Sequence, residues 1–371
     1  MRVFDPKTLD PAVGWVRAHE RHLSALFMAG GFLFDSWAFG RIDHPATQAV
    51  FIVYLLVAGI AIAAQHGLES RPQERQPSPR IRNVLMFVTQ FALGALLSGF
   101  CVFYIRSASL FASWPFLIFM AGVFIGQEAF RHYHSRLVFV VLLLFLSVYS
   151  YAIMLVPMVI LRIGQIPFLL SGVVALGIFY VYMRALERLG HERYRGARLQ
   201  IVAGMAVITV LINAFYFLKV FPPLPLVLTN AGIYHQAQKV GDDYHVRAEE
   251  EPAAWRALFG TNPTLHIQPR ARLYLYSAVF APRNLQTRIV HEWQYLDTEG
   301  RWATQQRISV PINGGREGGF RFYTLKTAPR PGQWRVNILS ADDRSIGRVR
   351  FAVETQAVPP ATRLVVLKAG D

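Results

Sequence analysis

The sequence predicts two structural classes in one chain: a membrane α-helical bundle of about seven transmembrane helices, then an all-β, immunoglobulin-like sandwich. Composition gives the first indication, because 53% of the 371 residues are hydrophobic and only 16% are charged. Soluble domains are normally about a quarter charged. The apolar excess fills residues 23–217 and then stops. Beyond it, short segments rich in β-branched and aromatic residues alternate with turn residues, as in a sandwich.

These composition changes divide the chain into five parts. The first 22 residues are polar and carry Asp5, Asp10 and Glu20, with no small-residue cleavage site after a short apolar core. We therefore expect no cleavable signal peptide, and the first apolar segment should remain as an anchor. The parts are a cytoplasmic arm (1–22), a seven-helix transmembrane domain (23–217), a proline-rich connector (218–230), a β-sandwich (231–355) and a C-terminal tail (356–371).

A transmembrane helix needs about 20 mostly apolar residues. Seven segments approach or meet this length, and the first is short and the weakest of them. Prolines near the ends of two of these segments, Pro157 and Pro167, are tolerated there. The predicted spans are 23–40, 48–65, 84–104, 108–127, 137–157, 165–183 and 199–217.

The basic residues between the spans predict the orientation. The arm and alternate loops carry 15 Lys and Arg residues, whereas the opposite loops carry Arg41, Arg106 and Arg162, with Lys219 after the last span. The positive-inside rule therefore places the N-terminus in the cytoplasm. Seven spans then place the C-terminal domain on the opposite side of the membrane from the cytoplasm.

Six strands are predicted after the connector "FPPLPLVLTN", with turn residues between them. No long helix interrupts this region, which favours an antiparallel sandwich. A short helix is expected at 250–260, and the tail after 356 is expected to pack poorly. The strands are 272–280, 287–296, 302–312, 319–326, 334–340 and 345–354.

The net charge of +15 does not indicate a nucleic-acid partner. The basic residues of the first half lie in loops, as membrane topology requires, and those of the second half are scattered without a nucleic-acid motif. The single cysteine, Cys101, excludes a disulfide within the chain and reads as a small buried apolar residue.

An aspartate inside the first span, Asp35, is a candidate site residue. An ionised carboxylate near the bilayer centre costs roughly 2.5–3.5 kcal/mol, so Asp35 should face the bundle interior. Two readings remain open: a structural ion pair, or a polar pocket open to the periplasm. Arg41, Asp43, Arg106 and Arg162 lie at the same predicted outer mouth.

The stretch "NGGREGGFR" (313–321) is the most distinctive motif. Its glycines permit backbone conformations closed to other residues, but the spacing is not that of a phosphate-binding loop. The stretch predicts either a glycine-rich hairpin or a loop that contacts a ligand. In the second case Arg316 would grip a carboxylate or phosphate bidentately, with Glu317 and Arg321 beside it.

The motif "VHEW" (290–293) places His291 and Glu292 on opposite faces of a strand, so they cannot form a local acid–base pair. Trp293 is expected in the core. The alternative is a sugar-stacking platform with Trp302 and Trp334, which needs these rings to be exposed. No GxSxG or HExxH motif occurs in this domain. We expect no catalytic residue, metal site or cofactor.

Several stretches together resemble one bacterial membrane-protein family. They are "GFLFDSWAFGRID", "FPPLPLVLTNAGIYH", "SAVFAPRNLQTRIVHEW", "GGREGGFRFYTLK" and "PGQWRVNIL", which occur in this order. Chains of that family end in the domain of unknown function 2914. The resemblance implies a helical membrane part, a C-terminal outer domain and a bacterial envelope location, and it implies no catalytic residue. With the predicted orientation, this location is the inner membrane, with the C-terminal domain in the periplasm.

Two functional hypotheses follow. In the leading one, the periplasmic sandwich binds or scaffolds an anionic envelope component, namely a glycan, a lipid head group or an acidic protein surface. In the alternative, the protein is an integral-membrane enzyme or transporter for a lipid-linked substrate, with Asp35, Arg41, Asp43 and Arg106 lining its site. Membrane lipids are the expected surroundings in both.

Overall fold

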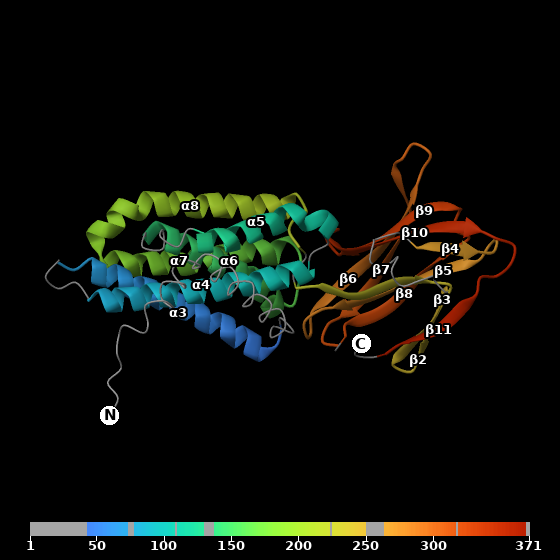
Figure 1. Ribbon diagram of the computed structural model, residues 1–371, viewed down its shortest axis with the longest axis horizontal. Coiled ribbons are helices and arrows are strands. Elements are labelled where there is room, and N and C mark those ends of the chain that lie inside the picture. The colour runs from blue at the N-terminus through green and yellow to red at the C-terminus, as the bar shows by residue number, and fades with distance from the viewer. Residues whose placement is uncertain are drawn as a thin grey trace, which may run out of the picture. The chain divides into compact units, whose positions relative to one another are not determined.

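The computed structural model describes residues 43–72, 78–107, 110–129, 137–222, 225–249, 263–316 and 318–368. Helices occupy the first part of the described chain, and strands occupy the last part (Figure 1). The last described helix ends at Phe217 and the first strand begins at Val227. The change in composition therefore coincides with a change in secondary structure.

The described residues form six helices, and five of them are long and apolar enough to cross a membrane. The sixth, α5, contains Pro115 and has a shorter apolar stretch, Ser113–Ile125. Large apolar side chains remain exposed along the five, including Ile60, Ile166 and Leu199, as expected of helices that face lipid. The six are α3 (Pro45–Glu69), α4 (Pro79–Ser107), α5 (Leu110–Ala129), α6 (Leu137–Ile160), α7 (Gln165–Leu189) and α8 (His191–Phe217).

Six of the seven predicted spans thus correspond to helices. The predicted first span, 23–40, lies outside the described residues, so the count of seven stays a prediction. Most observed helices extend beyond the predicted spans, and α8 begins at His191 rather than at 199. The polar residues between 191 and 198 continue the helix past the apolar core of the predicted span.

The chain divides into two compact units. The first combines Met1–Phe103, Ile118–Val148 and Tyr180–Met205. In it, the Tyr182 hydroxyl donates to the Gly59 carbonyl at 2.9 Å, and His66 Nε2 donates to the Leu186 carbonyl at 3.0 Å. Glu69 pairs with Arg193 beside them. These contacts join α3 to the end of α7 and the start of α8.

The second unit combines Tyr104–Leu117, Tyr149–Phe179 and Ala206–Asp371. Aromatic rings pack its helical segments together. Phe168 of α7 stacks on Tyr216 of α8, with ring centroids 3.6 Å apart and planes 14° apart. Phe116 of α5 packs against Phe221 at 4.5 Å.

The strands of the second unit form three sheets. All the paired strands are antiparallel except β4 and β10, which run parallel and correct the expectation of a purely antiparallel sandwich. One sheet has the order β1 (Val227–Tyr234), β5 (Arg272–Phe280), β8 (Phe320–Thr327). A five-stranded sheet has the order β4 (Thr264–Ile267), β10 (Ser345–Thr355), β9 (Gly332–Ser340), β6 (Gln286–Leu296), β7 (Trp302–Asn313). The third has the order β11 (Thr362–Leu367), β3 (Asp243–Glu249), β2 (Gln236–Val240).

The sandwich core lies between the five-stranded sheet and the sheet of β1, β5 and β8. Alternate residues of each strand enter it, as the period of two requires. Trp293 and Phe351 are fully buried and meet edge to face at 6.2 Å. Other core members are Leu273, Leu275, Val279, Ile289, Phe322, Trp334, Val336, Ile338 and Val353.

The third sheet corrects the expectation of a loosely packed tail. Residues Thr362–Leu367 of the tail form β11, which pairs with β3 over six residues. Tyr244 of β3 packs on Tyr276 of β5 at 5.2 Å. The helix expected at 250–260 lies outside the described residues.

A carboxylate joins the third sheet to the five-stranded sheet. Glu249 of β3 binds His235 at 3.0 Å, and binds both the backbone and the ring of His266 on β4, at 3.0 and 2.6 Å. Burial raises the pKa of Glu249, but the hydrogen bonds from the two histidines outweigh burial and the pKa is lowered on balance.

Candidate functional site

The outer face of the five-stranded sheet carries polar and charged side chains where the inner face carries the core. In β9, Trp334, Val336 and Ile338 point inward, so Arg335 and Asn337 point outward. The register then builds two rows across the strands. One row is Arg350, Arg335, Gln294 and Thr304, and the next is Arg348, Asn337, Glu292 and Arg307. We call the part formed by Glu292, Arg335, Asn337, Arg348 and Arg350 the arginine face.

Glu292 is the centre of a hydrogen-bonded network on this face. Its Oε2 accepts from Asn337 Nδ2 at 2.9 Å and from Gln294 Nε2 at 3.1 Å. Its Oε1 accepts from the Thr304 hydroxyl at 3.3 Å and lies 3.6 Å from Arg307 Nη1. The carboxylate is therefore held by neutral donors and by one arginine at the edge of the face.

The central arginine is anchored through neutral groups. Arg335 Nε donates to Gln294 Oε1 at 2.6 Å, and its guanidinium carbon lies 4.3 Å from the Trp302 ring centroid. Among the residues that the structure describes, no carboxylate lies within salt-bridge distance of Arg335. Arg348 is anchored in the same way, with its Nε donating to Asn337 Oδ1 at 2.7 Å.

Several cations lie close together on this face. Burial, together with the charges of Arg348 and Arg350, lowers the pKa of Arg335 to about 10, and Glu292 acts in the opposite direction. Burial and the charge of Arg350 also lower the pKa of Arg348. Arg335 stays charged at neutral pH, and the lowered pKa reflects burial first and the neighbouring cations second. An arrangement of this kind attracts anions.

The inner face of the same sheet carries a polar network that is buried away from solvent. His291 lies between the Ser277 and Thr324 hydroxyls, each 2.9 Å from a ring nitrogen, and its ring stacks on Phe322. His291 is fully buried, and burial lowers its pKa to about 3, so the ring is neutral. A substrate cannot reach these buried groups, and their hydrogen bonds stabilise the core.

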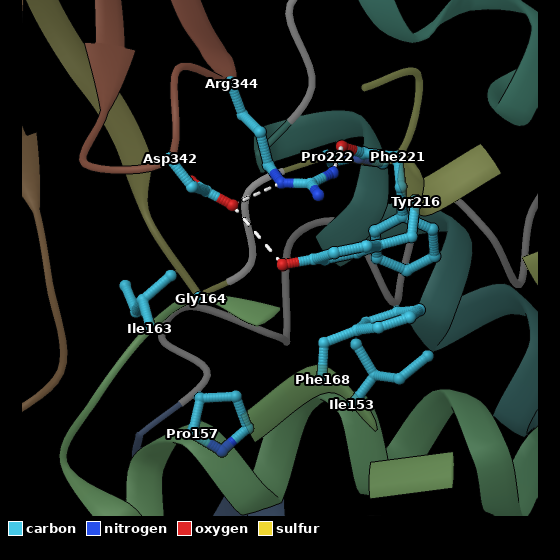
Figure 2. A pocket seen from close by; sticks show the side chains of 10 residues that line it. All are labelled: Ile153, Pro157, Ile163, Gly164, Phe168, Tyr216, Phe221, Pro222, Asp342 and Arg344. Atoms are coloured by element: carbon cyan, nitrogen blue, oxygen red, sulfur yellow. Dashed lines mark hydrogen bonds and ion pairs between the residues drawn. The ribbon is translucent and has the colours of Figure 1, made fainter. Parts of the chain in front are cut away.

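A second polar cluster lies where the β9–β10 turn meets helices α7 and α8 within the second unit. Arg344 Nε donates to Asp342 Oδ2 at 2.6 Å, and its Nη1 donates to the Phe221 carbonyl at 3.4 Å. The guanidinium carbon lies 3.4 Å from the Tyr216 ring centroid, and the Tyr216 hydroxyl donates to Asp342 (Figure 2). We call Tyr216, Asp342 and Arg344 the turn cluster.

The cavity beside the turn cluster is small. Its lining is mostly apolar, with Ile153, Pro157 and Phe168 facing Tyr216 (Figure 2). The space open to the centre of a water-sized molecule is about 20 Å³, which is room for about one water. Asp342 and Arg344 neutralise each other, and Ser340 donates to the second carboxylate oxygen at 2.6 Å. We therefore interpret this cluster as a structural contact that holds the β9–β10 turn in place, and not as a substrate site.

In and beside the predicted contact loop, Arg316 and Arg321 each lie over an aromatic ring, but over different ones. Arg316 is exposed over the Phe320 ring at 5.0 Å, and Arg321 of β8 lies over Tyr244 at 5.9 Å. Burial raises the pKa of Tyr244, while the charges of Arg321 and Arg316 lower it. Nε and Nη1 of Arg321 are buried and have no hydrogen-bond partner among the described residues. Glu317 lies outside the described residues.

The glycines of this loop have a structural explanation. The loop connects β7, at the edge of one sheet, to β8, at the edge of another, so it is not a hairpin within one sheet. A Cβ on Gly314 would lie 1.8 Å from the Pro282 carbonyl oxygen, and Gly319 has φ +89° against the β5 backbone. The glycines therefore let the loop pass close to residues 281–285. This explanation does not depend on whether Arg316 binds a ligand.

The predicted bundle site is only partly described. Asp35 and Arg41 lie outside the described residues, so the polar pocket around them stays a prediction. Asp43 precedes α3 in the first unit, and Arg106 lies in the last turn of α4 in the second unit. No group of three or more His, Cys, Asp or Glu side chains in the described part of the chain is placed to hold a metal ion.

The aromatic predictions for the sandwich have clear outcomes. His291 and Glu292 lie on opposite faces, and Trp293 is in the core, as predicted. Trp334 is also buried, so these two rings form no exposed platform. Sequence reasoning missed Arg335, Arg348 and Arg350, although each alternates with core residues in "WRVNI" and "GRVRF". It also missed Asp342 and Arg344, because their sequence context indicates only a turn.

The chain is thus of a class that joins helices able to cross a membrane to a C-terminal β-sandwich. Within the sandwich, residues 286–353 match the family described as "Protein of unknown function (DUF2914)". The C-terminal region therefore carries the domain of unknown function 2914, which confirms the resemblance. The matched segment runs through β6, β7, β8 and β9 and nearly all of β10, and it contains every residue of the arginine face.

The other comparisons are less informative. No curated protein matches the chain. An immunoglobulin-like protein from Pseudomonas aeruginosa is 11% identical over 25% of this chain and 80% of its own, with a TM-score of 0.18. The second structure is the alkylpurine DNA glycosylase of Pseudomonas fluorescens, bound to DNA with an abasic site analog. It is 10% identical over 85% of this chain and 100% of its own, with a TM-score of 0.23. Such TM-scores carry no argument, so the immunoglobulin-like assignment stays a prediction.

Proposed function

We propose that this is a multi-pass membrane protein whose β-sandwich binds an anionic component of the bacterial envelope through the arginine face. One observation carries the proposal. Arg335 is partly buried directly across from Arg350, and among the described residues it is held by the Gln294 amide and the Trp302 ring rather than by a carboxylate. Like charges this close repel one another, so a bound anion would relieve the repulsion as well as form new hydrogen bonds.

The binding role also fits the rest of the sandwich. The buried histidine is neutral and closed off, and the cavity beside the turn cluster holds about one water. Neither offers the space and the reactive groups that a lipid-linked substrate requires. The arginine face instead offers fixed cations on a rigid sheet, which is the arrangement of a binding surface.

We place the protein in the inner membrane, with the N-terminus in the cytoplasm and the sandwich in the periplasm. The basic loops support this orientation. Six helices alone would return the chain to its starting side, so the arm and the sandwich face opposite compartments only if 23–40 also spans. Cysteines introduced at the exposed positions Arg272 and Arg363 should react with an impermeant maleimide in intact spheroplasts. Labelling that requires permeabilised cells would contradict the orientation.

Co-purification tests the binding role. The full chain is extracted in native lipid discs as wild type, as Arg335→Glu/Arg348→Glu, and as the control Arg272→Glu/Arg363→Glu. The two variants change the net charge equally, and the control residues are exposed elsewhere on the sandwich. Mass spectrometry of bound lipids, glycans and proteins should find an anionic species that only the arginine-face variant loses. If both variants retain every bound species, the proposed function is wrong.

A further inference from the structure

The first two turns of α8 carry arginines in two different environments. Arg193 pairs with Glu69 of α3, and this carboxylate also accepts from Gln65 Nε2 at 3.1 Å. Arg195 and Arg198 are exposed, and no carboxylate of the described residues lies within salt-bridge distance of either. One arginine of this segment therefore has its partner within the protein, and the other two present their charge to the surroundings.

The two outward arginines share a helix face with exposed apolar side chains. Arg195 and Arg198 are three residues apart, so their Cβ atoms are about 5–6 Å apart. Leu199 and Val202 follow four residues after each arginine, and they are 80% and 51% exposed. A charged level followed directly by exposed apolar residues is the pattern of a helix that passes from the head-group layer into lipid.

Helix α7 repeats this pattern at the same level. It ends just before Gly190, and α8 begins just after it. A rise of about 1.5 Å per residue puts Arg184, Arg195 and Arg198 roughly 7–12 Å from this corner. Arg184 is exposed, lies 5.4 Å from the Tyr180 ring centroid and donates from Nη2 to the Tyr180 hydroxyl at 3.2 Å. Tyr180 is itself exposed one turn deeper, where a tyrosine suits the membrane interface.

The Tyr194 side chain shows that charges of the two helices lie together. Tyr194 is buried, and the charges of Arg184 and Glu187 of α7 and of Arg198 of α8 act on its hydroxyl. Glu187 pairs with Arg184 at 3.4 Å, so it offsets one positive charge of the group. We call Arg184, Arg195 and Arg198 the corner arginines, and their charge exceeds that of Glu187 by two.

The corner itself is held firmly against α3. His66 Nε2 donates to the Leu186 carbonyl at 3.0 Å, and the Ser70 hydroxyl donates to the His66 carbonyl at 2.7 Å. Gly190 packs so closely on Ser70 that a Cβ at this position would collide with the Ser70 hydroxyl. The backbone that carries the corner arginines is therefore fixed before any ligand binds, which lowers the entropic cost of binding.

These observations identify a ligand with two chemical parts. A guanidinium binds two oxygens of one phosphate side by side, and the corner arginines supply the charge that attracts it. The exposed apolar residues directly below them suit acyl chains, which a soluble anion lacks. We propose that the corner arginines bind the phosphate of an anionic phospholipid whose chains lie along Leu199 and Val202. This site is on the helices and does not depend on the arginine face of the sandwich.

Lipid selectivity of the full chain tests the proposal. The protein in neutral detergent is mixed with equal amounts of phosphatidylglycerol and phosphatidylcholine, and native mass spectrometry measures the bound lipids. Wild type should prefer phosphatidylglycerol, and Arg195→Gln/Arg198→Gln should reduce this preference on the order of tenfold. The matched control is Arg80→Gln/Arg82→Gln, which removes two exposed arginines from the first turn of α4. The control should keep the preference of wild type.

Each other result contradicts the proposal. A wild type without preference would show that the site does not exist. Equal losses in the two variants would show diffuse attraction by all the basic loops rather than a site at this corner. Glycerol 1-phosphate should not displace the lipid, and displacement at equal concentration would mean that the site binds a soluble anion.

A second variant keeps the test decisive if the glutamine variant does not fold, which circular dichroism would show. Arg195→Lys/Arg198→Lys keeps both charges but removes the planar guanidinium groups. It should lose severalfold in the preference for phosphatidylglycerol, and an unchanged preference would contradict recognition of the phosphate by arginine. The arginine face is intact in every variant, so failure of this inference leaves the proposed function of the sandwich in place.

Discussion

The hairpin of β9 and β10 holds arginines in two opposite electrostatic environments. At its turn, Arg344 is 5% exposed and is matched by Asp342, the Phe221 carbonyl and the Tyr216 ring. Along its strands, Arg335, Arg348 and Arg350 are partly exposed and share Glu292. One hairpin therefore contains a buried ion pair at its turn and a group of neighbouring, partly exposed arginines along its strands.

The difference separates structural charge from charge that is available for binding. A buried cation without a partner costs several kcal/mol, so a structural arginine comes with its partner. Excess charge on a partly exposed face costs less, because water screens it, and it can remain where another molecule supplies the opposite charge. The neutral His291 ring shows the same rule for a buried polar group, since each of its ring nitrogens has a hydroxyl partner inside the core.

Removing the partner of Arg344 should have the largest effect. Asp342→Ala leaves a buried guanidinium unpaired and should lower the free energy of unfolding by about 3–5 kcal/mol. The adjacent Asp343 offers a matched control, because its pair with Arg307 is exposed. Asp343→Ala should cost less than about 1 kcal/mol. Denaturant unfolding of the purified protein, followed by near-ultraviolet circular dichroism, measures both. Equal losses would show that the turn cluster is not a buried pair.

The closed core network predicts a dependence on pH. The pKa of His291 is about 3 in the fold, below the ordinary value of 6.5, so only the unfolded chain takes up its proton between these values. The contribution of His291 is complete above pH 6.5 and declines as the pH falls. The slope should be on the order of 1 kcal/mol per pH unit. Unfolding curves at pH 7, 6, 5 and 4 test this, and His291→Gln should flatten the slope.

Neutralising the shared carboxylate should separate stability from binding. Glu292→Gln keeps the shape of the side chain but removes the charge that offsets three arginines. The free energy of unfolding should fall by about 1–2 kcal/mol, because hydrogen bonds to a charged acceptor are worth more than those to a neutral one. The amount of the anionic species that co-purifies should rise, because a negative charge beside the arginines is removed. A fall in this amount would mean that Glu292 positions the ligand directly.

The sequence predicts which residues of a strand share one face, but it does not predict which strands lie next to each other in the sheet. Six strands could be predicted because alternation and turn residues mark each one. β1 follows a proline-rich connector and reads as part of it, and β2 and β11 are short with mostly exposed residues. The arginine face depends on the order β10-β9-β6, which places Arg335 between Arg350 and Gln294. Alternation within single strands does not specify that order.

The smallest effect on stability should come from the residue that matters most for binding. Arg335→Met keeps an apolar stem over Trp302 but loses the hydrogen bond to Gln294 and the attraction to the ring. These losses, each about 0.5–1.5 kcal/mol, are offset by the relief of repulsion from Arg348 and Arg350. The free energy of unfolding should change by less than about 1 kcal/mol, whereas Arg344→Met should lower it well beyond that. Co-purification of the anionic species should be lost in the first variant and kept in the second. A large loss of stability in Arg335→Met would mean that the arginine face is built to hold the sheet together rather than to hold a ligand.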